Sequence, residues 1–372
     1  MVTTPTEGFD MKMPCTLLLC CLALAPSLHA EEKTLKLYNW ADYFAEDTLS
    51  RFTAETGIKV IYDVMDGSET LEAKLMAGGS GYDLIFPGDT VGERLMRAGS
   101  LQPLDQSRLT ALNDIEPGLQ KLRTHYTYSN TATVPYTWGT IGLTYNTEQI
   151  KQRLPDAPVN SLDLLFKPEL AARFADCGIS LIDSPDEVLA VALNYLGRDP
   201  RSAKPADLAA ASELLLKLRP YIRKFQSQPV TDLVNGNLCL SLGYSGDMTQ
   251  AQRAADAAGK KVRFDYHIPR EGTTVWMDTM AIPVDARHPE YAYAFINFVM
   301  RPENMAAISN FTGYPTANAK ARPEVDPAMR NNLQIYPDEV TFERLIPGKD
   351  IPQADMRARM RVWTKFKTAT VK

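Results

Sequence analysis

Residues 35–64, LKLYNWADYFAEDTLSRFTAETGIKVIYDV, contain the pattern that decides the fold class. The first six residues alternate apolar and polar side chains, which predicts a β-strand. A helix is predicted next, because Asp47 suits its N-cap and Gly57 its end, and residues 59–64 are predicted as a second strand. A strand, a helix and a strand in succession predict parallel strands in an α/β sheet.

The same alternation continues along the chain. Further strands are predicted at residues 82–87, 179–182 and 238–244, and further helices at residues 69–77, from residue 248, and at residues 289–299. Two longer apolar, β-rich stretches, residues 133–146 and 274–283, are candidates for passing between lobes. The 372 residues exceed one typical core, and no long linker divides them. We therefore predict two α/β lobes joined by several short crossings.

The N-terminus has the pattern of an export signal. A short start at Met11 precedes an apolar run at residues 15–25, and a cleavage site follows Ala30. The run is too short to span a bilayer as a helix. We predict that residues 1–30 are a signal peptide, in which residues 1–10 are a misplaced start. A lipoprotein signal around Cys20 is the alternative, although the residues before it are leucines.

Two cysteines, Cys177 and Cys239, remain after removal of the signal. Cysteines in an oxidising compartment tend to pair, so a disulfide is the favoured prediction. Two buried free thiols are the alternative.

Several kinds of function leave no pattern in this sequence. The net charge of −5 offers no basic face for nucleic acid. Nucleotide-binding glycine motifs, the nucleophile elbow and paired histidines are all missing, and no C-x-x-C motif remains in the mature chain. We therefore predict no cofactor, no metal site, no catalytic residue and no enzymatic activity.

Aromatic and acidic residues gather instead at predicted strand ends and helix starts. In open α/β sheets, ligands bind at the carboxyl ends of the strands. Buried ammonium groups need carboxylates, and aromatic faces attract cations. The pattern predicts a cleft that binds a cation, with these candidate residues: Trp40, Asp42, Tyr43, Gly88, Asp89, Tyr244, Asp247, Trp276, Asp278 and Tyr314.

Each candidate also has a structural interpretation. Ser184, Pro185 and Glu187 suit the N-cap, N1 and N3 positions of a capping box, which would explain Glu187 without any ligand. Asp247 follows a glycine and is suited to cap the next helix. The aromatic residues are typical of a core. Asp278 is more informative, because an acid among apolar neighbours needs a partner.

Several of these segments, in the same order, resemble the putrescine- and spermidine-binding proteins of bacterial polyamine ABC transporters. The resemblance covers essentially the whole mature chain and is strongest to the putrescine-binding branch. It is carried by residues 37–64, by KLMAGGSGYDLIFP, CGISLIDSPDEVLAVALNYLG, LLLKLRPYIRKF and LVNGNLCLSLGYSGD, and by Trp276-Met277-Asp278.

The resemblance implies an α/β fold of the type II periplasmic-binding class, with two lobes and a ligand cleft between them. It implies a lobe of residues 33–137 plus 276–320, and a second lobe of residues 141–272 plus 321–372. It also implies a disulfide between Cys177 and Cys239. The ligand set carried over is Trp40, Asp42, Tyr43, Glu187, Tyr244, Asp247, Trp276, Asp278 and Tyr314.

The chain departs from the family pattern at a few of these positions. Gly88 stands where the family usually has serine, and Asp89 follows it. Tyr244 and Trp276 replace tryptophan and phenylalanine of the putrescine branch, and Ala41 replaces a hydroxyl residue. These changes put the particular amine in doubt more than the class of ligand.

The resemblance further implies a monomeric periplasmic protein that captures putrescine or spermidine by hinge closure and delivers it to an ABC-transporter permease. Binding of another amine or organic cation, such as agmatine, cadaverine or an amino acid, is one alternative. A sensor that presents its ligand to a membrane receptor is another.

Overall fold

A ten-stranded sheet runs through the described part of the protein, residues 32–370, in the computed structural model. The predicted signal peptide and its cleavage site lie outside the described residues. The strands are β1 (Thr34–Asn39), β2 (Lys59–Val64), β3 (Leu84–Ile85), β4 (Thr133–Asn146), β5 (Ile179–Leu181), β6 (Ile222–Phe225), β7 (Leu240–Tyr244), β8 (Phe264–His267), β9 (Thr273–Ala281) and β10 (Leu345–Pro347).

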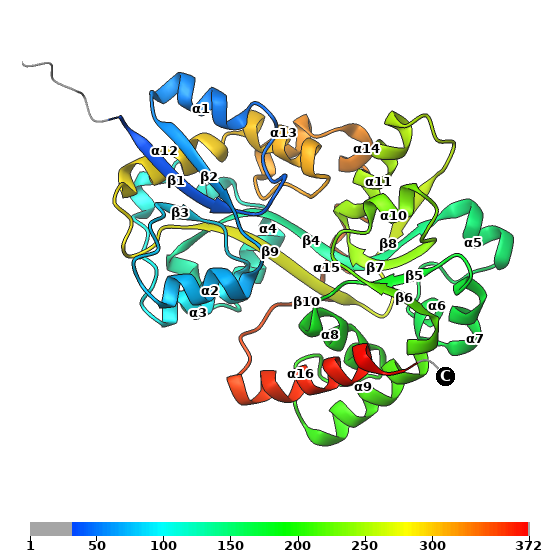
Figure 1. The fold of residues 1–372 in the computed structure, drawn as a ribbon. Coiled ribbons are helices and arrows are strands. Elements are labelled where there is room, and N and C mark those ends of the chain that lie inside the picture. The colour runs from blue at the N-terminus through cyan, green and yellow to red at the C-terminus, as the bar shows by residue number, and fades with distance from the viewer. Residues whose placement is uncertain (1–31, 371–372) are drawn as a thin grey trace, which may run out of the picture. The chain divides into compact units, whose positions relative to one another are not determined.

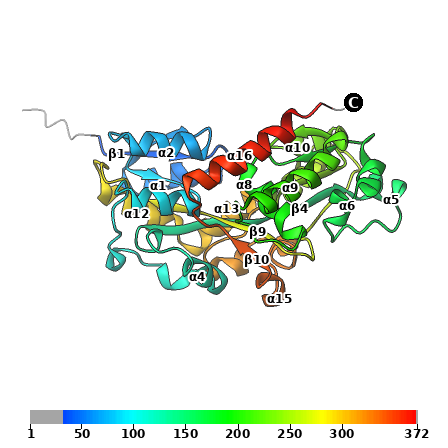
Figure 2. The same ribbon diagram turned by 90° about the horizontal axis from the view of Figure 1, so that it is seen from below.

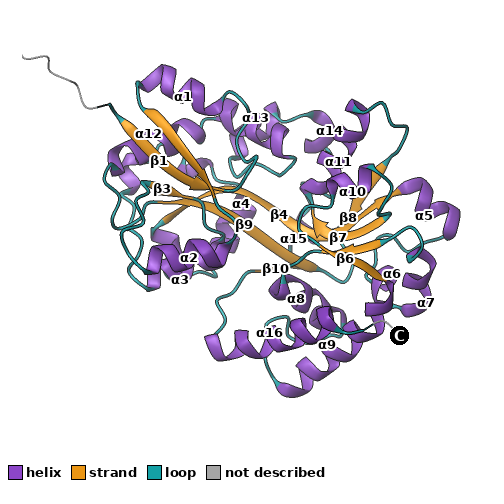
Figure 3. Ribbon diagram, viewed as in Figure 1, coloured by secondary structure: helices purple, strands orange, loops and turns teal. Residues whose placement is uncertain are grey.

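The helices lie on both sides of these strands, as Figure 3 shows. They are α1 (Thr48–Thr56), α2 (Ser68–Met76), α3 (Asp89–Arg97), α4 (Pro117–Arg123), α5 (Thr147–Arg153), α6 (Asp163–Phe166), α7 (Pro168–Ala171), α8 (Pro185–Tyr195), α9 (Pro205–Leu218), α10 (Val230–Val234), α11 (Gly246–Ala257), α12 (Pro289–Val299), α13 (Pro302–Thr312), α14 (Pro327–Arg330), α15 (Glu339–Phe342) and α16 (Gln353–Thr368). Within residues 32–370, no helix is long and apolar enough to cross a membrane.

The strand order is β2-β1-β3-β9-β4-β7-β5-β6, with β10 added beside β9 and β8 beside β4. β1 pairs in parallel with β2 and β3, and β5 pairs in parallel with β6 and β7. The prediction of an α/β fold with parallel strands is therefore confirmed. The helix predicted between β1 and β2 is α1, and Gly57 ends it in the left-handed conformation.

The long strands β4 and β9 connect the two groups of parallel strands (Figure 1). Thr133–Thr140 of β4 pairs antiparallel with β9, whereas Ile141–Tyr145 pairs with β7. Both stretches predicted as crossings therefore form strands at the junction, because their continuous apolar pattern suits burial on both faces. All fourteen residues of β4 are buried.

Two large hydrophobic cores lie on the two sides of this junction. The first gathers side chains from β1, β3, α12 and α13, and the second gathers side chains from β5, α8 and α9. Residues 321–345 also contribute to the first core, through Val325, Ile335 and Tyr336 among others, while α16 packs on α8 and α9 (Figure 2). Two cores connected by β4 and β9 give the predicted two-lobed architecture. The exact lobe boundaries stay a prediction.

The capping box predicted at the start of α8 is wrong. Pro185 does occupy the first turn, but the side chain of Ser184 makes no capping hydrogen bond. Instead, the guanidinium of Arg359 on α16 donates to the Asp186 side chain at 3.4 Å and to the Asp186 main-chain oxygen at 3.2 Å. A buried arginine from the C-terminal helix therefore holds this end of α8, and Glu187 is free of a capping role.

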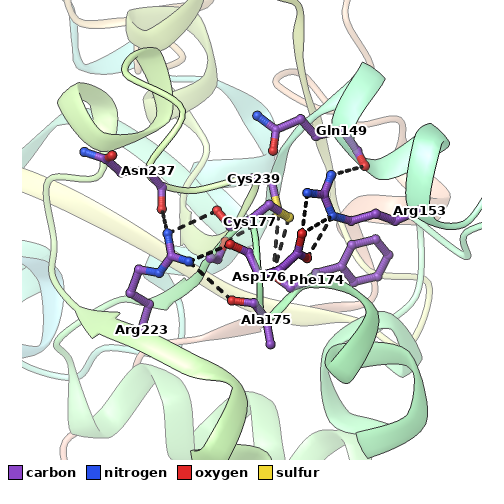
Figure 4. Close-up of polar contacts among 10 residues, drawn as sticks. Gln149, Arg153, Phe174, Ala175, Asp176, Cys177, Arg223, Asn237 and Cys239 are labelled. Atoms are coloured by element: carbon purple, nitrogen blue, oxygen red, sulfur yellow. Dashed lines mark hydrogen bonds and ion pairs between the residues drawn. A yellow bond between two sulfur atoms is a disulfide. The ribbon is translucent and has the colours of Figure 1, made fainter.

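The predicted disulfide between Cys177 and Cys239 is confirmed (Figure 4). The two Cα atoms lie 5.5 Å apart, which is usual for a disulfide. Cys239 directly precedes β7, and Gly178 separates Cys177 from the parallel strand β5, so the bond fixes the start of both strands. Arg223 supports the same corner by donating to the main-chain oxygens of Asp176, at 2.8 Å, and of Asn237.

Candidate ligand-binding site

Strand β9 brings two of the predicted ligand residues to the junction between the cores. Asp278 pairs in register with Thr137 of β4, and Trp276 pairs with Gly139. A Cβ atom at Gly139 would lie 2.6 Å from the indole of Trp276, so only glycine leaves room for this ring. Trp276 consequently packs across β4 and contacts both cores.

Four aromatic rings form a row that starts in one lobe and ends in the other. The ring of Tyr244, at the end of β7, meets Trp276 edge to face at 5.6 Å between centroids. Trp276 meets Tyr314 at 4.9 Å, and Tyr314 meets Tyr43 at 6.1 Å. Gly246 makes room for Tyr314, because a Cβ atom there would lie 2.5 Å from the tyrosine ring. This aromatic row is one wall of the candidate site.

Asp278 lies at the Tyr43 end of the aromatic row. The Tyr43 hydroxyl donates to Asp278 Oδ2 at 2.6 Å, so Thr137, 2.8 Å from the same hydroxyl, must be its donor. Burial raises the pKa of Asp278 to about 7, and the nearby charge of Asp89 acts in the same direction. The site therefore holds a carboxylate that is costly to ionise without a cation.

Asp247 lies at the other end, in the first turn of α11. Its side chain is 4% exposed, and Oδ2 accepts a hydrogen bond from the Tyr244 main chain at 3.1 Å. Burial raises the pKa of Asp247 to about 8. No lysine or arginine of residues 32–370 forms an ion pair with Asp247 or Asp278. The start of α11 has no side-chain cap, so the predicted capping role of Asp247 is wrong, and its carboxyl group is unneutralised.

A second pair of acids, Asp89 and Glu187, lies at the starts of α3 and α8. Asp89 accepts hydrogen bonds of 2.6 Å from the Tyr126 hydroxyl and the Thr90 main chain. Burial raises the pKa of Asp89 to about 6, and the charge of Glu187 adds to the effect. Burial also raises the pKa of Glu187, and its Oε2 atom has no hydrogen-bond partner among the described residues.

The remaining candidates lie at the edge of this cluster. The indole nitrogen of Trp40 is buried without a partner in the described chain. Asp42 is exposed. Within residues 32–370 it is the one residue other than glycine that has a positive φ, 53°. Gly88 bridges its main chain to Asp278, and a Cβ atom there would meet Asp278 at an ordinary 3.5 Å. Ring contacts, hydrogen bonds and electrostatic effects link the other eight candidates, and Trp40 packs against the core that contains Tyr43 and Tyr314.

Sequence analysis missed three residues at the site. Thr137 and Tyr126 each hydrogen-bond a candidate side chain, and the charge of Arg201 acts on both Asp89 and Glu187. Thr137 lies inside a strand that is buried throughout. An alternation of apolar and polar residues with a period of two would have marked Thr137 as facing the cleft, but this strand lacks it. Tyr126 and Arg201 lie in irregular segments, and no periodic signal could have found them.

Unpaired polar atoms also gather around these acids. Trp276 Nε1, Ser245 Oγ and Glu187 Oε2 are buried without hydrogen-bond partners among residues 32–370. Buried polar groups are normally paired, so such a group of exceptions is typical of a ligand site. No cluster of His, Cys, Asp or Glu in the described chain is arranged to hold a metal ion. The fold and the site together define a two-lobed solute-binding protein.

The chain belongs to the family of bacterial extracellular solute-binding proteins, whose model matches residues 48–334. It is 46% identical to the putrescine-binding periplasmic protein SpuD of Pseudomonas aeruginosa over 341 residues, which cover 91% of this chain and 93% of SpuD. It is 44% identical to the putrescine-binding periplasmic protein PotF of Escherichia coli, covering 92% and 93% of the two chains.

Solved structures show the same likeness. The spermidine/putrescine transporter substrate-binding protein PotD of Streptococcus pneumoniae superimposes with a TM-score of 0.77 at 29% identity, covering 90% of this chain and 98% of PotD. These comparisons confirm the type II periplasmic-binding fold with its ligand cleft. They also confirm that the chain is a solute-binding protein and not an enzyme.

Proposed function

We propose that this protein captures a linear amine with two or more positive charges in the periplasm and delivers it to the permease of an ABC transporter. One observation carries the proposal: two buried carboxyl groups, Asp247 and Asp278, have no lysine or arginine partner within residues 32–370 and flank one aromatic row. The names of SpuD and PotF, which are putrescine-binding proteins, support the same class of ligand.

The arrangement suits the two chemical parts of a diamine. Each ammonium end gains an ion pair with a buried carboxylate, which removes the cost of leaving that charge alone. The methylene stem lies on the aromatic row, where burial of four methylenes contributes about 3 kcal/mol at about 0.8 kcal/mol each. Contact of an ammonium with an aromatic face adds about 0.5–2 kcal/mol.

Hinge closure is the mechanism that follows from the placement of these residues. Tyr43 and Asp89 belong to segments of the first core, whereas Glu187 and Asp247 follow strands on the side of the second core. A ligand that contacts both groups stabilises the closed state by its differential affinity. β4 and β9 connect the lobes, so we place the hinge in these strands.

Calorimetric titration of the refolded mature protein tests the ligand class. The panel is putrescine, cadaverine, agmatine and spermidine, and refolding removes any amine carried through purification. We expect one-to-one binding of at least one of the four. If folded protein binds none of them, the proposal of an amine ligand is wrong, and other organic cations or amino acids become the candidates.

Amine binding near neutral pH is expected to release protons. In the free protein, Asp247 and Asp278 keep protons because burial raises their pKa values to about 8 and 7. An amine stays charged below about pH 10, and its ammonium groups favour the ionised carboxylates, so their pKa values fall. We expect release of about one to two protons per ligand near pH 6, falling to about zero above pH 9.

The proton release is measured by titration in buffers with different ionisation enthalpies. The same pKa shifts predict that the free protein loses stability as pH rises from about 4 to about 8, because the folded state holds these protons more tightly than the unfolded state. The thermal stabilisation by the amine should therefore increase over the same range. Binding without proton exchange at pH 6 would contradict the buried-carboxylate model.

A further inference from the structure

Arg201 lies in the loop between α8 and α9, beside the acids that begin α3 and α8. Its guanidinium Nη2 donates a hydrogen bond to the main-chain oxygen of Pro347 at the end of β10. The next residue, Gly348, is in close contact with Asp89 and Tyr126. A Cβ atom on Gly348 would lie 2.8 Å from Asp89 Oδ1 and 2.9 Å from the Tyr126 hydroxyl. Pro347 and Gly348, at the end of β10, therefore hold the Arg201 guanidinium near Asp89.

The charge of Arg201 acts on both acids of this group. It opposes the effect of burial on the pKa of Asp89 and on the pKa of Glu187. Arg359, which also approaches Glu187, is already engaged with Asp186. Arg201 Nε is buried and has no hydrogen-bond partner in the described chain, and the same holds for Glu187 Oε2. Each group therefore keeps one buried polar atom that residues 32–370 leave unpaired.

The four acids of the site therefore fall into two kinds. Asp247 and Asp278 have no ion-pair partner in the described part of the chain, so they depend on the ligand for a positive charge. Asp89 and Glu187 would carry a joint charge of −2 when ionised, and Arg201 reduces that charge to −1. A third ammonium group approaching Asp89 and Glu187 would meet a fixed guanidinium as well as the carboxylates.

We propose that Arg201 determines the charge of the preferred ligand, favouring diamines over triamines by reducing the attraction of Asp89 and Glu187 for a third ammonium group. The proposal rests on the proposed function, because it assumes an amine in the cleft. Its basis is electrostatic: every positive charge on the ligand is repelled by Arg201, so a ligand with three charges loses more than a ligand with two. Specificity often includes a group that repels the competing ligand. Here the repelling group is the Arg201 guanidinium, and the competing ligand is the triamine.

The test compares the affinities of putrescine and spermidine in wild type and in Arg201→Gln, by calorimetric titration at pH 8 and low salt. We expect the putrescine-to-spermidine affinity ratio to move at least tenfold toward spermidine, which equals about 1.4 kcal/mol. Arg201→Lys keeps the charge and should keep a ratio within about threefold of wild type. Asp89→Asn removes a negative charge and should move the ratio the other way.

Arg198→Gln is the matched control, because Arg198 lies in the same loop and pairs with Asp207 at 2.7 Å. This variant should leave the ratio unchanged. The proposal is overturned if folded Arg201→Gln keeps the wild-type ratio, or if Arg201→Lys moves the ratio as far as Arg201→Gln does. If Arg201→Gln does not fold, Asp89→Asn decides, and an unchanged ratio there overturns the proposal. Failure of wild type to bind either amine would instead refute the proposed function.

Discussion

Asp278→Asn is expected to weaken amine binding by two to three orders of magnitude, and Asp247→Asn by a similar factor. Removal of one partner of a buried, hydrogen-bonded charge pair costs about 2–5 kcal/mol, because the other charge stays buried without compensation. Among residues 32–370, no lysine or arginine forms an ion pair with either carboxylate to share its role. A loss of about 3–4 kcal/mol corresponds to the expected factor.

The same substitutions should stabilise the free protein at pH 8. Asparagine is nearly isosteric and still accepts the Tyr43 hydroxyl at position 278 or the Tyr244 main chain at position 247. It removes a buried charge whose ionisation opposes folding. Higher thermal stability together with weaker binding is therefore the signature of these two residues, and general damage to the fold cannot produce it.

Titration calorimetry and thermal denaturation measure both effects. Asp256→Asn is the matched control, because Asp256 lies on the same helix as Asp247 and pairs at the surface with Arg263. Surface substitutions of this kind stay within about 0.5 kcal/mol. If both single variants bind the amine as wild type does, carboxylates at positions 247 and 278 do not anchor the ligand.

The order of strands and helices could be predicted because local patterns decide it. The alternation at residues 35–64 marks β1, α1 and β2, and the continuous apolar runs at residues 133–146 and 274–283 mark the two strands that connect the lobes. The strand-end rule identified Tyr244, the last residue of β7, and Asp247 in the helix that follows, whereas Glu187 came from the family resemblance.

The failures come from contacts between segments that are distant in sequence. The start of α8 has the local signature of a capping box, but Ser184 makes no capping hydrogen bond, and Arg359, more than 170 residues away, donates to Asp186 in that turn. The contact between Gly348 and Asp89 is another example. These two residues are far apart in the sequence, and no local sequence pattern predicts that they meet. Local propensity therefore predicts elements and their ends, while tertiary contacts decide which acids remain available to a ligand.

Arg359→Ala is expected to lower the free energy of unfolding by about 3–5 kcal/mol. The side chain is 0% exposed and donates to the Asp186 carboxylate, to the Asp186 main chain, and to the main-chain oxygens of Pro200 and Ser202 at 3.2 and 3.1 Å. Alanine leaves these acceptors without a donor and creates a cavity, and each effect costs about 1–3 kcal/mol or more.

Chemical denaturation measures this loss, with Arg361→Ala as the control. Arg361 is an exposed arginine two residues further along α16, so its truncation should change stability by no more than about 0.5 kcal/mol. Arg359→Met fills the cavity but donates nothing, so it should recover only part of the loss. A wild-type stability in Arg359→Ala would show that α16 does not hold α8.

Arg359 also connects stability to ligand binding. Asp186 directly precedes Glu187, so loss of the guanidinium frees the turn that positions Glu187 in the cleft. We expect folded Arg359→Ala to bind the amine about tenfold more weakly, which is less than the loss in Asp278→Asn because no ligand charge loses its partner. The C-terminal helix would then serve as the support that keeps one wall of the cleft in place when the lobes close.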